Sequence, residues 1–425
     1  MNIRSNIFLS LLPLYLTLLM PIFLITGPFL SDLSISICGI VFLINSYKKN
    51  LKKYYNNSFV KFFIIFYLII LISSLTSDYE LFSLKSSFFY FRFALFALST
   101  WYLIDTNKNF LKYFFFSLSC AFFILVFDGY FQYFFNKNII GLIPLKDPNG
   151  PRISSFFGSE IILGSYLSRL FPLYFGLFIF FKKKLSNSHI NLHLIFFCLI
   201  YILIFLTGER TAFFIINSIL IFLIFLIHDF RKKFFFVFLT LVVFFSTTLY
   251  LKPEIGDRVI KYTFSQLQSK QNNKLVVFSS MHTSHYKTGI KMFLDNKILG
   301  IGPNNFRKRC NEKKYRTLAF ADSGDNITTS CSTHPHSIYI QLLAETGIIG
   351  FSLIFSLFFS LIIFSLKILF KNNVIKIDNL TISLMGGFII NLFPLMPAGN
   401  FFNNYINIIY FMPLGFYLWS FKNKI

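Results

Sequence analysis

The stretch THPHSIYIQLLAETGIIGF, residues 333–351, leads from two histidines around a proline into a long apolar run. The run continues to about residue 370. A helix needs only ~20 residues to cross a bilayer, so the run is too long for one straight span. We therefore expect its first turns to form an interfacial helix that continues or bends at Gly347 or Gly350. In that arrangement His334 and His336 stand at the mouth of a transmembrane helix.

The composition of the whole chain agrees with a membrane protein. Of 425 residues, 55% are hydrophobic and 13% are charged, and the mean hydropathy is +0.64. A soluble domain has about a quarter of its residues charged, which excludes that class and predicts an all-α polytopic integral membrane protein. The first apolar run, from about Ile7 to Ile25, lacks a small-residue cleavage site and is expected to stay in place as a helix.

Apolar runs of span length predict about twelve transmembrane helices. They lie near residues 6–25, 28–46, 60–77, 86–104, 112–134, 160–181, 191–207, 211–229, 234–251, 337–370, 379–398 and 403–421. The chain then divides into helices 1–9 in residues 1–251, one large external loop in 252–335, and helices 10–12 in 336–425.

Basic residues sort to alternate loops and set the orientation. Examples are Lys48 and Lys49, Lys182–Lys184 and Arg231–Lys233. The positive-inside rule places these loops and both termini in the cytoplasm. The loop 252–335 is then external, and an even number of spans agrees with this.

The external loop has a strongly basic balance. It carries fourteen Lys and Arg against six Asp and Glu, a net charge of +8. Such an excess suits an anionic partner such as phosphate, pyrophosphate or a lipid headgroup. The alternative is ordinary attraction to acidic membrane lipids. No pattern typical of nucleic-acid binding is present.

Two of the five cysteines, Cys310 and Cys331, lie in this loop. In an oxidising periplasm they are expected to form a disulfide, worth ~3 kcal/mol in the chain-entropy model. The bridge would tether the basic segment 307–316 beside His334 and His336; the alternative is two free thiols. No CxxC or HExxH spacing occurs, so no metal site is predicted.

Two segments on the external side offer side chains for chemistry. An imidazole has an unperturbed pKa near ~6.5 and can accept a proton at neutral pH. Pro335 predicts a helix start close to His336, which would place His336 and Tyr339 on one helix face. Arg210, in the turn 207–211, has a guanidinium that matches phosphate oxygens. The alternatives are a histidine that caps the helix and an arginine that anchors the span at the interface.

Two further segments are external candidates. Arg152 lies in the segment 151–158, and Arg169 follows two to three turns into the next span. Charge at that depth is costly and is functional by default, although a structural pair of Arg169 with Glu160 is equally compatible. The segment MFLDNKILGIGPNNF, residues 292–306, has glycines and a proline that enforce a turn.

These segments together resemble the O-antigen ligase and O-antigen polymerase family of bacterial membrane glycosyltransferases. The family pattern M-F-x-D-x-P-x-x-G-x-G-P-x-N-F is matched by residues 292–306, and H-N-x-Y-L-x-x-x-x-E-x-G-x-x-G by residues 336–350. Ser337 replaces the usual Asn, and Lys297 stands where the family often has Pro. His282 and Tyr286 stand at the positions where the family commonly has an Arg and a Trp. The missing arginine removes one phosphate contact that the resemblance would imply, and Lys287, Arg307 or Arg309 are alternatives for it.

The resemblance implies a glycan donor linked to undecaprenyl pyrophosphate and an active site on the periplasmic face of the bacterial inner membrane. The acceptor is lipid A core for a ligase, a nascent glycan for a polymerase, or a protein. His336 is implied as general base and Arg210 as the catalytic group that stabilises the leaving pyrophosphate with Arg152. The other implied substrate-binding residues are Arg169, His334, Tyr339, His282 and Arg307. The resemblance also implies that transfer inverts the anomeric configuration of the sugar and needs no metal or other cofactor.

Glu345 lies nine residues after His336, half a turn away on an ideal helix. A structural ion pair, for example with an arginine, is therefore favoured over a catalytic acid. A multispan lipid or solute transporter is an alternative to the transferase, but it predicts polar residues near mid-membrane. Apart from Arg92, Asp128, Arg169 and the Asn-rich region 391–407, the spans are apolar, and the polar groups gather at one face.

Overall fold

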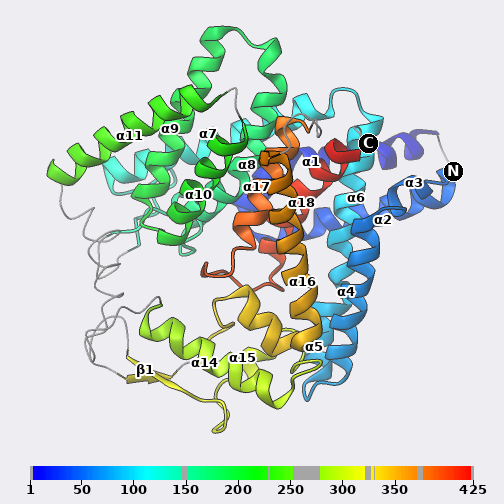
Figure 1. The fold of residues 1–425 in the computed structure, drawn as a ribbon. Helices are drawn as coiled ribbons and strands as arrows, with labels where there is room; N and C mark the ends of the chain where they lie inside the picture. Colours follow the sequence, from blue (N-terminus) through cyan, green and yellow to red (C-terminus); the bar gives the residue numbers. More distant parts are fainter. Residues whose placement is uncertain are drawn as a thin grey trace.

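The computed structural model describes residues 3–145, 151–227, 230–251, 278–320, 327–329, 331–370 and 377–422. It is almost entirely helical (Figure 1). The longer helices are α1 (Ile3–Thr26), α2 (Pro28–Lys49), α4 (Ser58–Leu75), α6 (Phe91–Thr106), α7 (Phe110–Phe135), α8 (Leu163–Phe181), α9 (Asn187–Leu206), α10 (Arg210–Leu226), α11 (Arg231–Leu251), α14 (Ser280–Asp295), α16 (Ile338–Phe370), α17 (Asn379–Asn391) and α18 (Asn404–Lys422). The shorter elements are α3 (Lys52–Tyr55), α5 (Glu80–Ser87), α15 (Phe306–Arg309) and the single turns η1 (Phe88–Tyr90), η2 (Ser155–Phe157) and η3 (Lys182–Lys184).

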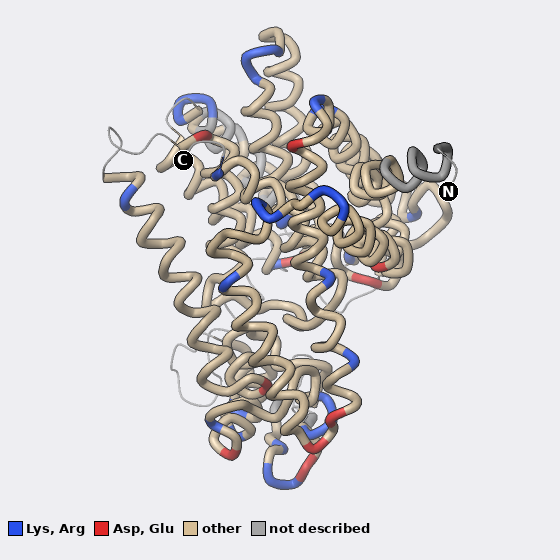
Figure 2. The backbone as a smooth tube through the Cα atoms, turned by 90° about the vertical axis from the view of Figure 1, so that its right-hand side faces the viewer, with Lys and Arg blue, Asp and Glu red and all other residues tan. Residues whose placement is uncertain are grey.

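The helices are those of a multi-pass membrane protein. Seven are long and apolar enough to cross a membrane, and three more apolar helices are shorter, counted over the described residues. Each of the twelve ranges expected from the sequence contains helix, while the number of twelve spans itself stays a prediction. Charged residues gather mostly towards the two ends of the molecule, and few lie between them (Figure 2).

Helix α8 lies at the centre of the bundle. Nearly all of its residues are buried, and it packs against α7, α9, α10 and α17. The Ser383 hydroxyl of α17 donates to the Pro172 carbonyl of α8 at 2.6 Å and ties the two helices together. This packing sets the depth of Arg169 in the protein.

Helix α16 bends at Gly347, which confirms the expected bend. Gly347 has φ 65° and non-helical ψ. A Cβ there would lie 2.2 Å from the Ile298 carbonyl oxygen, and the next amide, of Ile348, donates to the Lys297 carbonyl at 2.8 Å. Glycine is required because both the left-handed backbone and the close approach exclude a side chain. The residues before the bend form a separate short helix against the segment 296–302.

The predicted loop 252–335 has its own structure where it is described. It contains α14, α15 and an antiparallel hairpin of β1 (Leu318–Phe320) and β2 (Ile327–Thr329). Residues 252–277, 321–326 and 330 lie outside the described residues. The hairpin is the one sheet in the described part of the chain and a small departure from an all-α fold. In Figure 1, α14, α15 and α5 lie together at the lower end of the molecule, and α4 separates α5 from α3.

Candidate active site

Four histidine side chains converge where α14 meets the chain just before α16. The ring centroids of His334, His285 and His282 lie 4.2, 5.1 and 5.6 Å from that of His336. His282 and His285 come from one face of α14, because residues three apart are neighbours on a helix. The structure thus joins His282, His334 and His336, which the sequence singled out, with His285; these four form the histidine cluster.

His336 has an unusual backbone conformation. Its φ is 57°, in the left-handed region that few residues other than glycine adopt. Two hydrogen bonds to Ala398 hold the segment: the Ala398 amide donates to the His336 carbonyl at 3.0 Å, and the Ala398 carbonyl is 3.1 Å from Nε2 of His334. Such strained residues concentrate at functional sites. The loop between α17 and α18 therefore fixes both histidines.

Tyr339 points away from the shared face that the sequence predicted. Helix α16 begins at Ile338, so His336 precedes the helix and is not in its register. The Tyr339 hydroxyl donates to the Leu392 carbonyl at 2.7 Å, and its ring packs against Phe355. The predicted common face of His336 and Tyr339 is wrong, and a contact of Tyr339 with substrate stays a prediction.

The tautomer of His334 follows from its partners. The Ala398 carbonyl can only accept, so Nε2 of His334 carries hydrogen. Nδ1 is then the acceptor, and the Thr333 hydroxyl lies 2.9 Å from it. Both nitrogens of His334 are engaged. The ring nitrogens of His336, by contrast, make no hydrogen bond to the described residues, which leaves them for a substrate hydroxyl.

Burial keeps the histidine cluster uncharged at neutral pH. Desolvation, with a contribution from His336, lowers the pKa of His282 and His285 to about 4 and that of His334 to about 3. Burial also lowers the pKa of His336. An uncharged imidazole can accept a proton, so His336, whose nitrogens make no hydrogen bond to the described residues, is in the state that a base requires.

Arg210 brings positive charge to the same place. It is the first residue of α10, and its guanidinium further lowers the pKa of His282. The preceding residue, Glu209, accepts hydrogen bonds from the amides of Gly164 and Ser165 at 2.6 and 3.0 Å. This carboxylate caps the N-terminus of α8 and is stabilised there by the helix dipole. The turn 207–211 thus joins the start of α8 to the histidine cluster.

Arg152 and Arg169 lie around Glu209. Burial raises the pKa of the Glu209 carboxyl to about 7, while the charges of Arg152 and Arg169 act in the opposite direction. The backbone of Arg152 pairs with Leu145, and the Gln132 side chain accepts from the amides of Ser154 and Ser155 at 3.0 and 2.8 Å. This loop holds Arg152 within electrostatic reach of Glu209.

Arg169 is buried and bound on several sides. It donates to the Ser165 hydroxyl at 3.0 Å, to the Tyr410 hydroxyl at 3.0 Å, and to the Asn391 side chain. These partners differ from Glu160, the structural partner that the sequence left open. Its guanidinium therefore joins α8 to α17 and α18 at the level of Glu209.

Arg307 approaches the histidine cluster from another element. It lies in α15, is exposed, and one of its Nη atoms is 3.4 Å from the Asn304 side-chain oxygen. Its charge contributes to the lowered pKa of His334. Arg210 acts on His282 and Arg307 on His334, so positive charge reaches the cluster from two elements.

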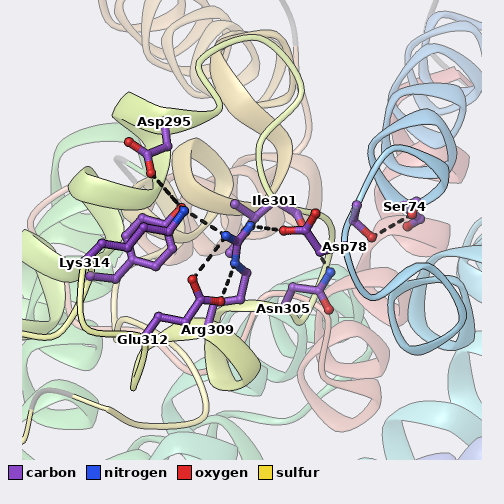
Figure 3. Close-up of polar contacts among 10 residues, drawn as sticks. Ser74, Asp78, Asp295, Ile301, Asn305, Arg309, Glu312 and Lys314 are labelled. Atoms are coloured by element: carbon purple, nitrogen blue, oxygen red, sulfur yellow. Dashed lines mark hydrogen bonds and ion pairs between the residues drawn. The ribbon is translucent and has the colours of Figure 1, made fainter.

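Arg309, an alternative for the phosphate contact, is instead a structural residue. Figure 3 shows its guanidinium between Asp78 and Glu312, at 2.6 and 2.8 Å. The Tyr315 hydroxyl is 3.2 Å from the same guanidinium and donates to Asp295 at 2.8 Å. Because Asp78 follows α4, this network fastens α15 to the α4–α5 turn.

Cys310 and Cys331 form a disulfide, with Cα atoms 5.0 Å apart. Cys310 directly follows α15 and is fully buried beside Met292, Phe306 and Tyr315. The bridge joins this small core to the chain just before His334, and so links the basic segment 307–316 to the histidine cluster.

Glu345 has amide partners rather than the arginine that the sequence favoured. Its carboxylate accepts from the Phe306 amide at 3.0 Å and from the Gln341 side chain at 2.9 Å. Gln341 also donates to Asn400 at 2.7 Å. The expectation of a structural role is supported by this geometry, while the expected charged partner is not found among the described residues.

The sequence reasoning missed His285 as a site residue. It is 4% exposed, and both ring nitrogens lack a hydrogen-bond partner in the described part of the chain. Its spacing of three from His282 on a helix was the available signal. Within the described residues, no three His, Cys, Asp or Glu side chains are arranged to hold a metal ion.

A match to a known protein family spans the segments that form the centre of the site. Residues 194–355 match a family model described as O-antigen ligase. The matched segment includes Arg210 and the whole histidine cluster, and Arg152 and Arg169 precede it. No curated protein shows a significant match to the chain. The match supports the family resemblance drawn from the sequence motifs.

Proposed function

We propose that this chain, whose residues 194–355 match the O-antigen ligase family, transfers a glycan from a polyprenyl pyrophosphate to an acceptor hydroxyl. One observation carries the proposal: four uncharged imidazoles lie together just before α16, within the electrostatic reach of Arg210. A neutral base beside a fixed cation suits attack by a hydroxyl with departure of an anionic group.

His336 is the proposed general base. Its ring nitrogens make no hydrogen bond to the described residues, whereas both nitrogens of His334 are engaged. His336 takes the proton of the acceptor hydroxyl as the oxygen attacks the anomeric carbon. The new carbon–oxygen bond forms while the bond to the pyrophosphate breaks, and both bonding electrons leave with the pyrophosphate. One displacement of this kind inverts the anomeric configuration.

Arg210 is proposed to stabilise the leaving pyrophosphate, with Arg152 beside it. The link is Glu209, which precedes Arg210 and feels the charges of Arg152 and Arg169. Guanidinium groups bind phosphate oxygens in pairs of parallel hydrogen bonds. In this account they carry the electrostatic role that a divalent cation has in other transferases. Transfer is therefore expected to continue in EDTA.

The proposed location is the bacterial inner membrane, with the site on the periplasmic face and both termini in the cytoplasm. The basic loops that set this orientation include Lys52 and Lys53 in α3. Helix α4 separates α3 from α5, which lies at the same end of the molecule as α14 and α15 (Figure 1). Undecaprenyl pyrophosphate is the proposed carrier, and a lipid A core is the proposed acceptor.

A deletion strain tests this function. It is complemented with the wild-type gene, with His336→Ala, or with the control His189→Ala, which removes an exposed side chain in the first turn of α9. The wild type and the control are expected to restore the surface glycan, and His336→Ala to leave it absent. Full glycan in the deletion strain, or with His336→Ala, would overturn the proposal.

The same strain separates a ligase from a polymerase. A ligase defect leaves the acceptor bare, with lipid-linked polymer accumulating in the membrane. A polymerase defect leaves the acceptor with a single repeat unit. We propose the ligase activity, so a bare acceptor with accumulating lipid-linked polymer is expected. An acceptor with a single repeat unit would instead show that the chain is a polymerase.

A further inference from the structure

A second polar site lies between α2, α5, α6 and the chain that follows α17. It is a cavity of about 380 Å³, lined in part by the cations Lys85, Arg92 and Arg307. The acidic residue of this lining, Asp32, is paired with Arg92 at 2.8 Å. The cavity wall therefore keeps an excess of positive charge, supplied by three different elements.

Amide groups and rings complete the wall. The Asn400 side chain donates to Asn304 at 2.6 Å, and Asn304 donates to Ser86 at 2.5 Å. These bonds hold the two asparagines in fixed orientations at the cavity wall. Phe93 and Phe402 are buried and provide apolar surface in the same lining. Charge, fixed amides and aromatic surface together suit a ligand with hydroxyl groups, an apolar face and an anionic substituent.

Two residues of the cavity lining, Asn400 and Arg307, link it to the histidine cluster. Asn400 follows Ala398, whose carbonyl binds His334, by two residues. Arg307 contributes to the lowered pKa of His334, whereas Arg210 contributes to that of His282. In Figure 1, α10 lies to the left of α16, and α4 lies to its right with α5 below it. The histidine cluster thus has two cationic groups near it. Arg210 is proposed to bind the leaving pyrophosphate, whereas Arg307 has no role in the proposed transfer step.

We infer that this cavity binds a saccharide carrying an anionic substituent, phosphate or carboxylate, as the acceptor-side subsite. The inference rests on the proposed function, because it places the acceptor hydroxyl beside His336. The volume of the cavity falls within the ~300–1,000 Å³ usual for small-molecule sites. Lys85 and Arg307 bind the anion, and the asparagine amides bind the sugar hydroxyls.

Binding is tested without turnover on the full chain in nanodiscs of neutral phosphatidylcholine. Saturation-transfer NMR measures the affinity for glucose 1-phosphate, glucuronate and neutral glucose. The double variant Lys85→Gln/Arg307→Gln is compared with Lys297→Gln/Lys313→Gln, which removes two exposed lysines outside the cavity. Melting temperatures check that both variants are folded.

The charged sugars are expected to bind at least ~10-fold more tightly than glucose, and the cavity variant to lose at least ~10-fold of that affinity. The control is expected to change it by less than about 2-fold. Equal binding of glucose, or unchanged affinity in the cavity variant, would overturn the inference. So would complete displacement of the sugar by phosphatidylglycerol in the nanodisc, which would assign the cavity to a lipid headgroup.

The outcome is separable from the test of the proposed function. His336→Ala is expected to keep the sugar affinity while it loses transfer. Binding without any transfer by the wild type would remove the function and leave the cavity as an anionic-sugar site. Transfer that persists without charge-dependent binding would remove the inference alone.

Discussion

The ring centroids of His285 and His336 lie 5.1 Å apart, and both nitrogens of the buried His285 ring lack a hydrogen-bond partner among the described residues. Buried polar groups are almost always partnered in folded proteins. Both nitrogens are closed off from solvent, so His285 meets the site through its ring contact with His336. Under the proposed function we expect His285 to position the ring of the base.

The variant His285→Phe separates this role from a structural one. An unpartnered buried polar group costs ~1–3 kcal/mol of folding free energy. Its removal should therefore leave the melting temperature unchanged or raise it. The transfer rate should fall by about 10-fold or more. In the control His193→Phe, removal of a ring bonded to Tyr174 at 3.1 Å should lower the melting temperature and spare transfer per folded molecule. An active, destabilised His285→Phe would contradict the assignment.

The histidine cluster predicts a loss of stability in mild acid. The pKa values of His282 and His285 are about 4 and that of His334 about 3, against a usual ~6.5. The unfolded chain therefore binds more protons below pH ~6.5, and stability falls as the pH drops from there towards the folded values. Melting temperatures measured between pH 7 and 4 should decline, less steeply in His282→Gln/His285→Gln. An identical slope in the double variant would refute this explanation.

Gly347→Ala is expected to destabilise the bend of α16. The residue has φ 65°, and a Cβ would lie 2.2 Å from the Ile298 carbonyl oxygen, so the variant combines backbone strain with a clash. A loss above ~1–3 kcal/mol is expected in the free energy of unfolding. Gly27→Ala is the matched control, because Gly27 has φ 125° but nothing within 4 Å of its Cβ position. Equal losses would show that the close approach to residue 298 is unimportant.

The disulfide is expected to stabilise the segment around the histidine cluster. Cys310→Ser/Cys331→Ser removes a link that closes a loop of 21 residues' separation, and ~3 kcal/mol is expected to be lost. Melting with and without dithiothreitol measures the effect. Reductant should lower the melting temperature of the wild type and leave that of the double variant unchanged. Insensitivity of the wild type would contradict this.

Much of the fold could be predicted from the sequence because it depends on local patterns. Apolar runs of span length mark helices in every range where they were expected. The bend at Gly347 was predicted because an over-long run and a glycine are both visible in the sequence. The hairpin of β1 and β2 was not, since its strands are three residues long and carry no alternating pattern.

The site was less predictable because it depends on contacts between distant segments. Motifs predicted roles for His336 and Arg210, but the neighbourhood of Lys85 and Arg307 follows from packing that no local pattern encodes. The register of Tyr339 was mispredicted because the left-handed backbone at His336 breaks the helix before it begins. The partner of Glu345 was mispredicted because backbone and side-chain amides can satisfy a buried carboxylate as well as an arginine can.

Glycan transfer by the purified chain tests the role of His336 as the base. The wild type, His336→Ala and the control His189→Ala are incubated with polyprenyl-pyrophosphate-linked glycan and acceptor, with and without EDTA. His336→Ala is expected to lose ~10²–10⁴-fold of the transfer rate at unchanged melting temperature, while the control keeps the wild-type rate. A His336→Ala enzyme that transfers glycan at the wild-type rate would contradict the assignment of His336 as the base.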